Sequence, residues 1–365
     1  MHNTAQVALF RGVGQPFEIS RRPLDDSSDG NVRVRVMLAT ICGSDLHTVT
    51  GRRSVPLPCA LGHEAIGVVA APTQLRDAYG NSLNEGDRIT WSIAASCGRC
   101  YNCDNKNLPQ KCEGLFKYGH AGGETNVGFS GGFAEYIQLQ PGTAIYRIPS
   151  ALTERETVPL NCAFATVLDG LDAVGVKSGD DAVVQGAGML GIYAACYLRE
   201  NGCESVMVVD YREDRLRTAA RFGATHTFNL TDTSVDDVGY AVQQITNHHG
   251  ADLVVEVSGV SAALSNAVDW LGFGGRCLTL GFVYPGAEVS LDAQKVVTKC
   301  LTIRGLHNYH PSALGEAVRF VEEKRDRYPF DALIGATYPL VEIDAAFERA
   351  QRGDLIRVAV DPQME

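Results

Sequence analysis

Two clusters of cysteine and histidine lie within the first 112 residues of the chain. The first comprises Cys42 and the segment Gly62-His63-Glu64, and the second comprises Cys97, Cys100, Cys103 and Cys112. Thiolate sulfur and imidazole nitrogen are the ligands that zinc prefers. Four cysteines form a closed tetrahedral site, whereas fewer protein ligands leave a coordination position open for water or substrate. The two clusters therefore predict two zinc ions per chain, one catalytic and one structural.

The second cluster has the spacing Cys97-x2-Cys100-x2-Cys103-x8-Cys112. Four unrelated buried thiols would need apolar surroundings, but most of the residues between these cysteines are polar. Because a polar segment cannot form an apolar core, a metal crosslink is the simplest way to order it. The segment 97–112 is therefore predicted to hold the structural zinc. Its polar residues include Arg99, Asn102, Asp104, Asn105, Lys106 and Lys111.

The first cluster needs a third protein ligand besides Cys42 and His63. Cys162 is the preferred choice, and Glu64, which directly follows His63, is the nearest competitor. A lone cysteine is often only a small buried apolar side chain, so the alternative stays open. The sequence thus predicts a catalytic zinc held by Cys42, His63 and either Cys162 or Glu64.

A glycine-rich loop follows a predicted strand in the middle of the chain. The residues Gly186-Ala187-Gly188-Met189-Leu190-Gly191 fit the pattern G-x-G-x-x-G, after the predicted strand 181–185 and before a helical run that reaches Glu200. Without a ligand, the pattern would be only a tight glycine turn. In this strand-loop-helix context it predicts that Gly186, Gly188, Met189, Leu190 and Gly191 bind a dinucleotide, with its pyrophosphate at the helix N-terminus.

An acidic residue ends the next predicted strand, 205–210. A carboxylate at Asp210 would accept hydrogen bonds from the adenosine ribose hydroxyls. It would also repel a 2′-phosphate, so NAD is favoured over NADP. Arg212 and Arg215 lie close in the sequence and weaken that preference, and Arg215 is itself a candidate cofactor contact.

The pattern of predicted elements changes near residue 150. Short β segments separated by glycine and proline come first, and strands alternating with helices follow from about residue 181. Such alternation predicts an α/β fold with a doubly wound parallel sheet. The predicted strands are 32–36, 65–70 and 131–137 in the first part, and 181–185, 205–210, 253–257, 276–280 and 301–304 in the second.

Composition is that of an ordinary globular protein, with 45% hydrophobic and 21% charged residues among 365. A net charge of -11 argues against nucleic acid or an anionic membrane as a partner. The start of the chain lacks the basic and apolar regions of a secretory signal, and no apolar run is long enough to span a bilayer. Eleven cysteines fit metal ligands and buried thiols in a reducing cytoplasm better than disulfides.

These motifs, in this order, resemble the zinc-dependent medium-chain dehydrogenase/reductase superfamily of the alcohol dehydrogenase type. The resemblance covers essentially the whole chain. It implies a GroES-like catalytic domain at 1–160 and 305–365, an NAD-binding Rossmann domain at 161–304, and a homodimer or homotetramer. The implied reaction is hydride transfer between an alcohol, or the matching aldehyde or ketone, and NAD(H).

The resemblance also implies roles for individual residues. Ser44 resembles the hydroxyl that bonds the reacting oxygen, His47 the outer end of a proton relay, and Asp45 the carboxylate that orients His63. Cys42, His63 and Cys162 resemble the zinc ligands, with Glu64 as the acidic neighbour that can exchange onto the metal. Leu280 and Phe282 fall where the family contacts nicotinamide, and Arg357 where it pairs with pyrophosphate. There are two departures: the last cysteine spacing is one residue longer than usual, and Gly43 stands where some relatives have a phosphate-binding arginine.

The substrate is the least constrained prediction. Several segments resemble a branch proposed to act in phosphonate catabolism: 48–53, 108–112, 117–120 and 305–309. Arg52 and Arg53 either form a solvated surface pair or bind an anionic substrate such as a hydroxyalkyl phosphonate, with His307, Asn308 and Tyr309 as further donors. Polyol, cyclitol and terpene-alcohol dehydrogenases are the competing enzymes. A zinc-free reductase or a non-catalytic binding protein of the same fold is the alternative of another class.

Overall fold

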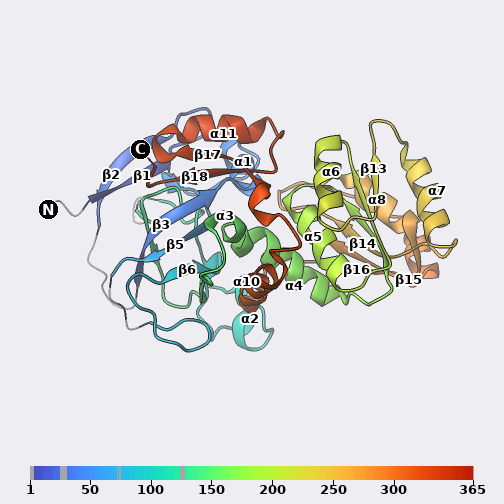
Figure 1. Ribbon diagram of the computed structural model, residues 1–365, viewed down its shortest axis with the longest axis horizontal. Helices are drawn as coiled ribbons and strands as arrows, with labels where there is room; N and C mark the ends of the chain where they lie inside the picture. Colours follow the sequence, from blue (N-terminus) through green and yellow to red (C-terminus); the bar gives the residue numbers. More distant parts are fainter. Residues whose placement is uncertain (1–3, 25–30, 72, 74, 124–127, 365) are drawn as a thin grey trace. The chain divides into compact units, whose positions relative to one another are not determined.

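The computed structural model describes residues 4–24, 31–71, 73, 75–123 and 128–364. The chain divides into two compact units, which Figure 1 colours along the sequence. Unit 1 comprises Met1–Ala165 and His310–Glu365, and unit 2 comprises Thr166–Tyr309. The predicted boundaries after 160 and 304 lie a few residues earlier at both junctions. The chain therefore leaves unit 1 once, forms unit 2, and returns.

A seven-stranded sheet forms the centre of unit 1, in the order β10-β6-β5-β3-β18-β17, with β9 paired to β3. The C-terminal strand β18 lies inside this sheet, antiparallel to β3 and parallel to β17. The strands are β3 (Val32–Thr40), β5 (Glu64–Val69), β6 (Arg88–Trp91), β9 (Tyr136–Leu139), β10 (Ile145–Arg147), β17 (Ile334–Pro339) and β18 (Arg357–Asp361).

Two smaller sheets complete the β structure of unit 1. The order β2-β1-β4 joins β1 (Thr4–Phe10), β2 (Glu18–Pro23) and β4 (Cys59–Ala60), and β7 (Ala94–Ala95) pairs with β8 (Phe116–Lys117). The helical segments are α1 (Gly43–Val49), α2 (Tyr101–Asp104), η1 (Pro109–Lys111), α3 (Glu154–Thr157), η3 (Leu160–Phe164), α10 (Ser312–Lys324), η4 (Phe330–Leu333), η5 (Leu340–Glu342) and α11 (Ile343–Gln351).

The core of unit 1 follows from strand alternation. Along β3, buried residues alternate with half-buried ones from Val32 to Val36, because successive side chains point to opposite faces of a sheet. Ile89, Trp91 and Phe133 are fully buried in the same cluster. Unit 1 is therefore a β-rich structure around a large apolar core, with a second, smaller apolar cluster beside β1.

The predicted strand 131–137 is wrong over its first part, since the strand found there is β9 (Tyr136–Leu139). Gly131 and Gly132 pass directly against the chain at Ala60 to Gly62, and a Cβ at Gly131 would lie 2.2 Å from the Ala60 oxygen. The Gly132 N–H donates to the Gly62 oxygen at 2.6 Å. These glycines serve a close backbone approach beside His63 rather than a strand.

Unit 2 is a parallel six-stranded sheet in the order β13-β12-β11-β14-β15-β16. The strands are β11 (Asp181–Gln185), β12 (Ser205–Asp210), β13 (His226–Asn229), β14 (Ala251–Glu256), β15 (Leu271–Thr279) and β16 (Thr302–Gly305). The helices are α4 (Ala165–Val174), α5 (Met189–Glu200), α6 (Glu213–Arg221), α7 (Val235–Ile245), α8 (Ser261–Trp270) and α9 (Ala293–Thr298). This is the predicted doubly wound Rossmann architecture.

Helices cover both faces of this sheet. Val183 of β11 lies in a core cluster with residues of α7 and α8, while the next residue, Val184, is fully buried on the opposite face. Helices α5 and α6 pack on β11, β12 and β13. Strands buried on both faces have continuous apolar sequences, which is why the predicted strands 181–185 and 205–210 agree with β11 and β12. The short, partly exposed β13 was not predicted.

In the described part of the chain, no helix is both long enough and apolar enough to cross a membrane. All eleven cysteines are free thiols. The free thiols agree with the sequence-based expectation of metal ligands and buried thiols instead of disulfides.

Ile89→Ala tests the core of unit 1. The side chain is fully buried, so its truncation leaves a cavity and should lower the free energy of unfolding by about 2–5 kcal/mol. Urea unfolding measures this, with Val341→Ala, at a residue 59% exposed, as the control. An equal effect of the two substitutions would contradict the described core.

Candidate metal and cofactor sites

The first predicted metal cluster comes together inside unit 1. Cys42, His63, Glu64 and Cys162 each offer one ligand atom, and these atoms all lie within 4.8 Å of one another. Cys42 directly precedes α1, His63 and Glu64 stand at the start of β5, and Cys162 lies in the helical turn η3. Cys42, His63 and Glu64 are buried, and Cys162 is half-buried. Both candidate third ligands, Cys162 and Glu64, therefore reach the same point.

Charge distribution within this cluster suits a cation. The Cys162 thiol donates a hydrogen bond that lowers the pKa of Cys42, against the opposing effect of burial, and the Arg357 guanidinium lowers it further. The same hydrogen bond raises the pKa of Cys162. Thiolate is the metal-binding form of cysteine. Two thiols, an imidazole and a carboxylate in a buried space of this size fit zinc.

Asp45 and Ser44 approach the two ring nitrogens of His63. The Asp45 Oδ1 lies 3.5 Å from Nδ1, and the Ser44 Oγ lies 3.4 Å from Nε2. Burial alone would lower the pKa of His63, but the Asp45 carboxylate and Cys42 raise it to about 10. Asn161 Nδ2 donates to the His63 carbonyl at 3.1 Å. The ring therefore presents Nε2 to the cluster while Nδ1 faces Asp45.

Glu64 is held by two partners in the unit 1 core. Arg357 Nη2 donates to its Oε1 at 2.9 Å, and Thr40 Oγ1 donates to its Oε2 at 2.5 Å. Burial raises the pKa of Glu64 to about 8, although Arg357 opposes the rise. Arg357 also donates to the Ile41 carbonyl at 3.3 Å and is 7% exposed. The structure thus locates Arg357 beside the metal cluster, and its pairing with pyrophosphate stays a prediction.

His47, the predicted end of the proton relay, lies half-buried on α1. Burial lowers its pKa, and the nearby Arg52 and Arg53 lower it further. The imidazole is therefore largely neutral at pH 7 and able to accept a proton.

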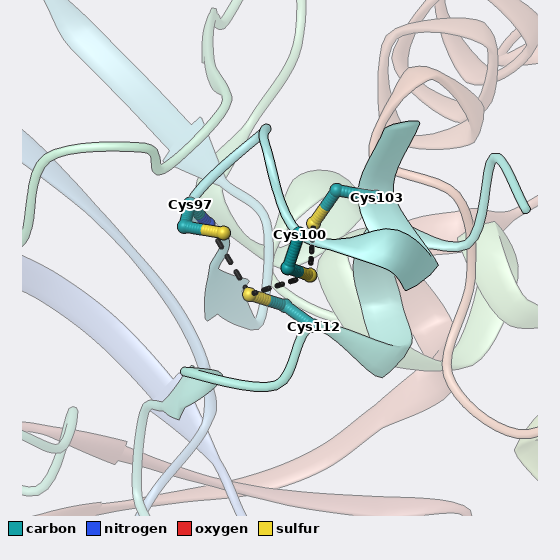
Figure 2. Close-up of side chains that lie close together, drawn as sticks. All are labelled: Cys97, Cys100, Cys103 and Cys112. Carbon is teal, nitrogen blue, oxygen red and sulfur yellow. Dashed lines mark hydrogen bonds between the residues drawn. The ribbon is translucent and has the colours of Figure 1, made fainter. Parts of the chain in front are cut away.

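The four-cysteine segment gathers as predicted, as Figure 2 shows. The Cys100 Sγ lies 3.4 Å from that of Cys103 and 3.9 Å from that of Cys112. The Cys97 N–H donates to the Cys112 Sγ at 3.3 Å. The N–H groups of Glu113 and Cys103 donate to Cys100 and lower its pKa to about 6. The longer last spacing, which includes η1, still brings Cys112 to the other three sulfurs.

The glycine-rich loop of unit 2 connects β11 to α5. Gly186 has φ 109°, in the region that favours glycine. A Cβ at Gly191 would lie 1.8 Å from the Gly186 oxygen, so only glycine allows the helix to start this close to the loop. Gly188 precedes α5 directly, Met189 is its buried first residue, and Leu190 is half-buried.

Asp210 binds the backbone of this loop. Its Oδ2 accepts from the Ala187 N–H at 2.7 Å, and its Oδ1 accepts from the Arg212 N–H at 2.9 Å. Arg212 forms an ion pair with Asp214 at 2.9 Å, and Arg215 is half-buried on α6. Each Asp210 oxygen has a further lone pair for a ligand hydroxyl. The carboxylate thus orders the loop in addition to any contact with ribose.

Leu280 and Phe282 follow β15. Leu280 is 4% exposed, and its N–H donates to the Glu256 oxygen at 2.9 Å. Phe282 is partly buried against the apolar core of unit 2. Sequence reasoning missed Glu256, whose Oε1 accepts from the N–H groups of Ser258 and Gly259 at 2.7 Å and shapes the turn beside Gly186.

Arg52 and Arg53 directly follow the C-terminus of α1. The Arg53 N–H donates to the His47 carbonyl at 3.1 Å, and Arg53 is half-buried whereas Arg52 is exposed. His307, Asn308 and Tyr309, the other proposed donors, belong to unit 2.

Sequence reasoning also missed Lys117 as a site residue. This half-buried lysine lies on β8, and burial together with repulsion from Arg53 lowers its pKa to about 8, while Cys162 and Cys42 oppose the shift. The segment 117–120 entered the sequence analysis only through its resemblance to the phosphonate branch, because only the fold brings Lys117 near Cys42 and Cys162.

Comparisons with known proteins agree with this geometry. Residues 28–150 match the alcohol dehydrogenase GroES-like domain, and residues 190–323 match the zinc-binding dehydrogenase family. The 5-exo-hydroxycamphor dehydrogenase of Pseudomonas putida is 31% identical over 93% of this chain and 94% of that protein. The chain is a zinc-binding dehydrogenase of the alcohol dehydrogenase family.

Other dehydrogenases are similar to this chain over most of their length. An L-threonine 3-dehydrogenase of Shewanella halifaxensis is 29% identical over 78% of this chain and 79% of that protein. The crystal structure of an alcohol dehydrogenase from Thermotoga maritima has a TM-score of 0.93 and 29% identity, covering 99% of this chain and 100% of that one. An alcohol dehydrogenase of Escherichia coli, solved with NADH, shares the fold with a TM-score of 0.83 and 24% identity, over 98% and 99% of the two chains.

Proposed function

We propose that this dehydrogenase binds two zinc ions and oxidises an alcohol with NAD, or reduces the matching aldehyde or ketone. The observation that carries the proposal is the buried cluster of Cys42, His63, Glu64 and Cys162. Zinc held there would supply a Lewis acid toward the substrate oxygen. The residues around the cluster determine how the proton moves.

The Ser44 hydroxyl lies 3.4 Å from the Nε2 of His63, and Ser44 stands one turn before His47 on α1. We assign Ser44 the hydrogen bond to the substrate hydroxyl and His47 the outer end of the proton path. Because burial and neighbouring arginines keep His47 neutral, it can accept the proton that the alcohol loses. Asp45 orients His63 without touching substrate.

The two units divide this work. We assign the catalytic role to Met1–Ala165 with His310–Glu365, and NAD binding to Thr166–Tyr309. Asp210, supported by the glycine-rich loop, gives the preference for NAD, with Arg215, Leu280, Phe282 and Arg357 as further cofactor contacts. The edge strand β16, with mostly exposed residues, is available for strand pairing in a homodimer or homotetramer. The free thiols support a cytoplasmic location.

We further propose a small anionic alcohol as the substrate, with a hydroxyalkyl phosphonate as the leading candidate. Arg53 and Lys117 support this choice, because both are half-buried cations: Arg53 acts on His47, and Lys117 interacts electrostatically with Cys42 and Cys162. A neutral apolar alcohol would gain nothing from these cations. The second candidate is a terpene alcohol, which the hydroxycamphor dehydrogenase relative favours.

Metal analysis tests the two zinc sites. The wild-type protein should contain two zinc ions per chain, and Cys42→Ala should lose one zinc and the activity while unfolding at nearly the same temperature. Cys100→Ala should lose the other zinc and unfold at a lower temperature, because the polar segment 97–112 then lacks its crosslink. Cys300→Ala, at an exposed thiol outside both clusters, is the control. One zinc in the wild type, or an active Cys42→Ala protein, would refute the assignment.

Cofactor kinetics test Asp210. Asp210→Gly should raise the efficiency with NADP relative to NAD by about tenfold, since a 2′-phosphate no longer meets the carboxylate. Asp210→Ser separates charge from loop order, because its hydroxyl can still accept from the Ala187 N–H. Asp232→Ala, at an exposed carboxylate in the same unit, should leave the efficiency with NADP relative to NAD unchanged. A wild type that already prefers NADP would show the reading of Asp210 to be wrong.

Paired substrates test the anion prediction. Arg53→Ala and Lys117→Met should each lower kcat/KM for a hydroxyalkyl phosphonate roughly tenfold to a hundredfold, on the order of 1.5–3 kcal/mol for a charged hydrogen bond. Neither should affect a neutral alcohol of similar length by as much. Arg52→Ala should have the smaller effect, and exposed Arg352→Ala is the control.

The pH profile adds a second measurement to this comparison. Because the pKa of Lys117 is lowered to about 8, its charge is present below pH 8 and lost above it. The kcat/KM for the phosphonate should therefore fall as pH rises through 8, and Lys117→Met should remove that step. Equal, small losses on both substrates would exclude the anion assignment in favour of a neutral alcohol.

A further inference from the structure

His120 lies face to face with His63. Their ring centroids are 5.1 Å apart with an interplanar angle of 29°, and the two residues are 9% and 2% exposed. We propose that His120 is a positioning residue that covers one face of the His63 ring and fixes the direction in which Nε2 points at the metal. This inference rests on the proposed function, because it gives His63 the role of metal ligand.

Asp45 and Ser44 orient the nitrogen-bearing edge of the His63 ring but restrain the tilt of its plane less. The Asp45 Oδ1 lies 3.5 Å from Nδ1 and the Ser44 Oγ lies 3.4 Å from Nε2, both at the long end for hydrogen bonds. Such contacts at the ring edge tolerate a tilt of the ring plane. A stacked aromatic face opposes that tilt, because rotation of His63 about its Cβ–Cγ bond moves one edge of the ring toward His120.

The chain holds His120 firmly in this place. On one side, the Gly119 N–H donates to the Ser130 oxygen at 2.8 Å, and on the other, the Ser130 Oγ donates to the Ala121 oxygen at 2.9 Å. The His120 N–H closes a turn onto the Lys117 oxygen at 3.2 Å. One serine thus anchors the residues before and after His120.

Gly119 brings this turn against the metal ligand. It has φ 69°, and a Cβ there would lie 2.8 Å from the Gly62 carbonyl carbon and 2.9 Å from the His63 nitrogen. Only glycine allows the backbone of the turn to touch the backbone of the ligand. Gly119 therefore fixes the turn beside His63, and this turn brings the His120 ring against the His63 ring.

A direct metal contact is the competing role for His120. Among the described residues, the group of mutually close donor atoms comprises Cys42, His63, Glu64 and Cys162, without His120. An imidazole that stacks on a ligand acts through the ligand. Its planar face should then matter more than its nitrogens, which separates the two roles by substitution.

Three variants of the full-length enzyme make this separation. His120→Phe keeps an aromatic face and removes the nitrogens, His120→Asn keeps a polar nitrogen and removes the ring, and His120→Ala removes both. Cobalt(II) in place of zinc gives an absorption spectrum that depends on ligand geometry. Zinc release to a chelator gives a second measurement that does not use activity. His310→Ala, at a half-exposed histidine of unit 1, is the control.

The positioning role predicts that His120→Phe resembles the wild type in both measurements. His120→Ala and His120→Asn should shift the cobalt spectrum and release one of the two zinc ions at least about tenfold faster, a loss typical of residues that orient metal ligands. The zinc of the segment 97–112 should be released at the wild-type rate in all variants.

Two results would overturn the inference. Wild-type spectra and zinc release in both His120→Ala and His120→Asn would show that the stack does not orient His63, even if the variants unfold at lower temperature. A phenylalanine variant as defective as the alanine variant would show that the ring face is not what acts. A wild-type protein that binds no cobalt at the Cys42 cluster would instead refute the proposed function, and the inference with it.

Discussion

Arg357 and Glu64 form an ion pair of 2.9 Å inside unit 1, where their side chains are 7% and 0% exposed. The pair joins β18, the last strand of the chain, to β5, and a second Arg357 hydrogen bond reaches the Ile41 carbonyl next to Cys42. Removal of one partner from a buried pair leaves an uncompensated charge and typically destabilises a protein by about 3–5 kcal/mol. The arginine therefore couples the return of the C-terminal segment to the geometry of the metal cluster. Glu64 accepts a hydrogen bond from Arg357 and still offers an oxygen to the donor group that it shares with Cys42, His63 and Cys162.

The two metal clusters solve different physical problems. Cys97 and Cys100 are exposed or half-exposed in a segment of polar residues, which buries too little apolar surface to fold by itself. Under the proposed function, zinc there would take the place of an apolar core. The cluster of Cys42, His63, Glu64 and Cys162 lies among residues already ordered by the fold of unit 1, which buries the first three donors and half-buries Cys162. Loss of metal should therefore have separate consequences for stability and for chemistry.

The parts of the structure that the sequence predicts are those determined by local pattern. Strands β11 and β12 have the predicted bounds because buried parallel strands are continuous apolar runs between glycine-rich turns. The four cysteines of the segment 97–112 were predicted to act together because cysteines at short spacing in polar surroundings have few other uses, whereas the third partner of Cys42 and His63 was left open between Cys162 and Glu64. The glycines at 131 and 132 were misread as strand, since their purpose is contact with Ala60 to Gly62, which only the tertiary structure brings close. The surroundings of Lys117, His120 and the Arg357–Glu64 pair were not predicted for the same reason, because each depends on residues distant in sequence.

The positions of individual charged residues say more about the substrate than the net charge of the chain does. In a chain with a net charge of -11, the charge of Arg53 acts on His47 and Lys117, and Lys117 in turn feels Cys42 and Cys162. Arg53 and Lys117 are half-buried, whereas Arg52 is exposed like a solvated surface residue. Partial burial of a lysine that is also repelled by a neighbouring arginine is unfavourable, and binding of an anion would offset that cost. An apolar terpene alcohol would instead have to displace water from both cations. The choice between the two substrate classes therefore depends on Arg53 and Lys117 and not on the arginine pair as a whole.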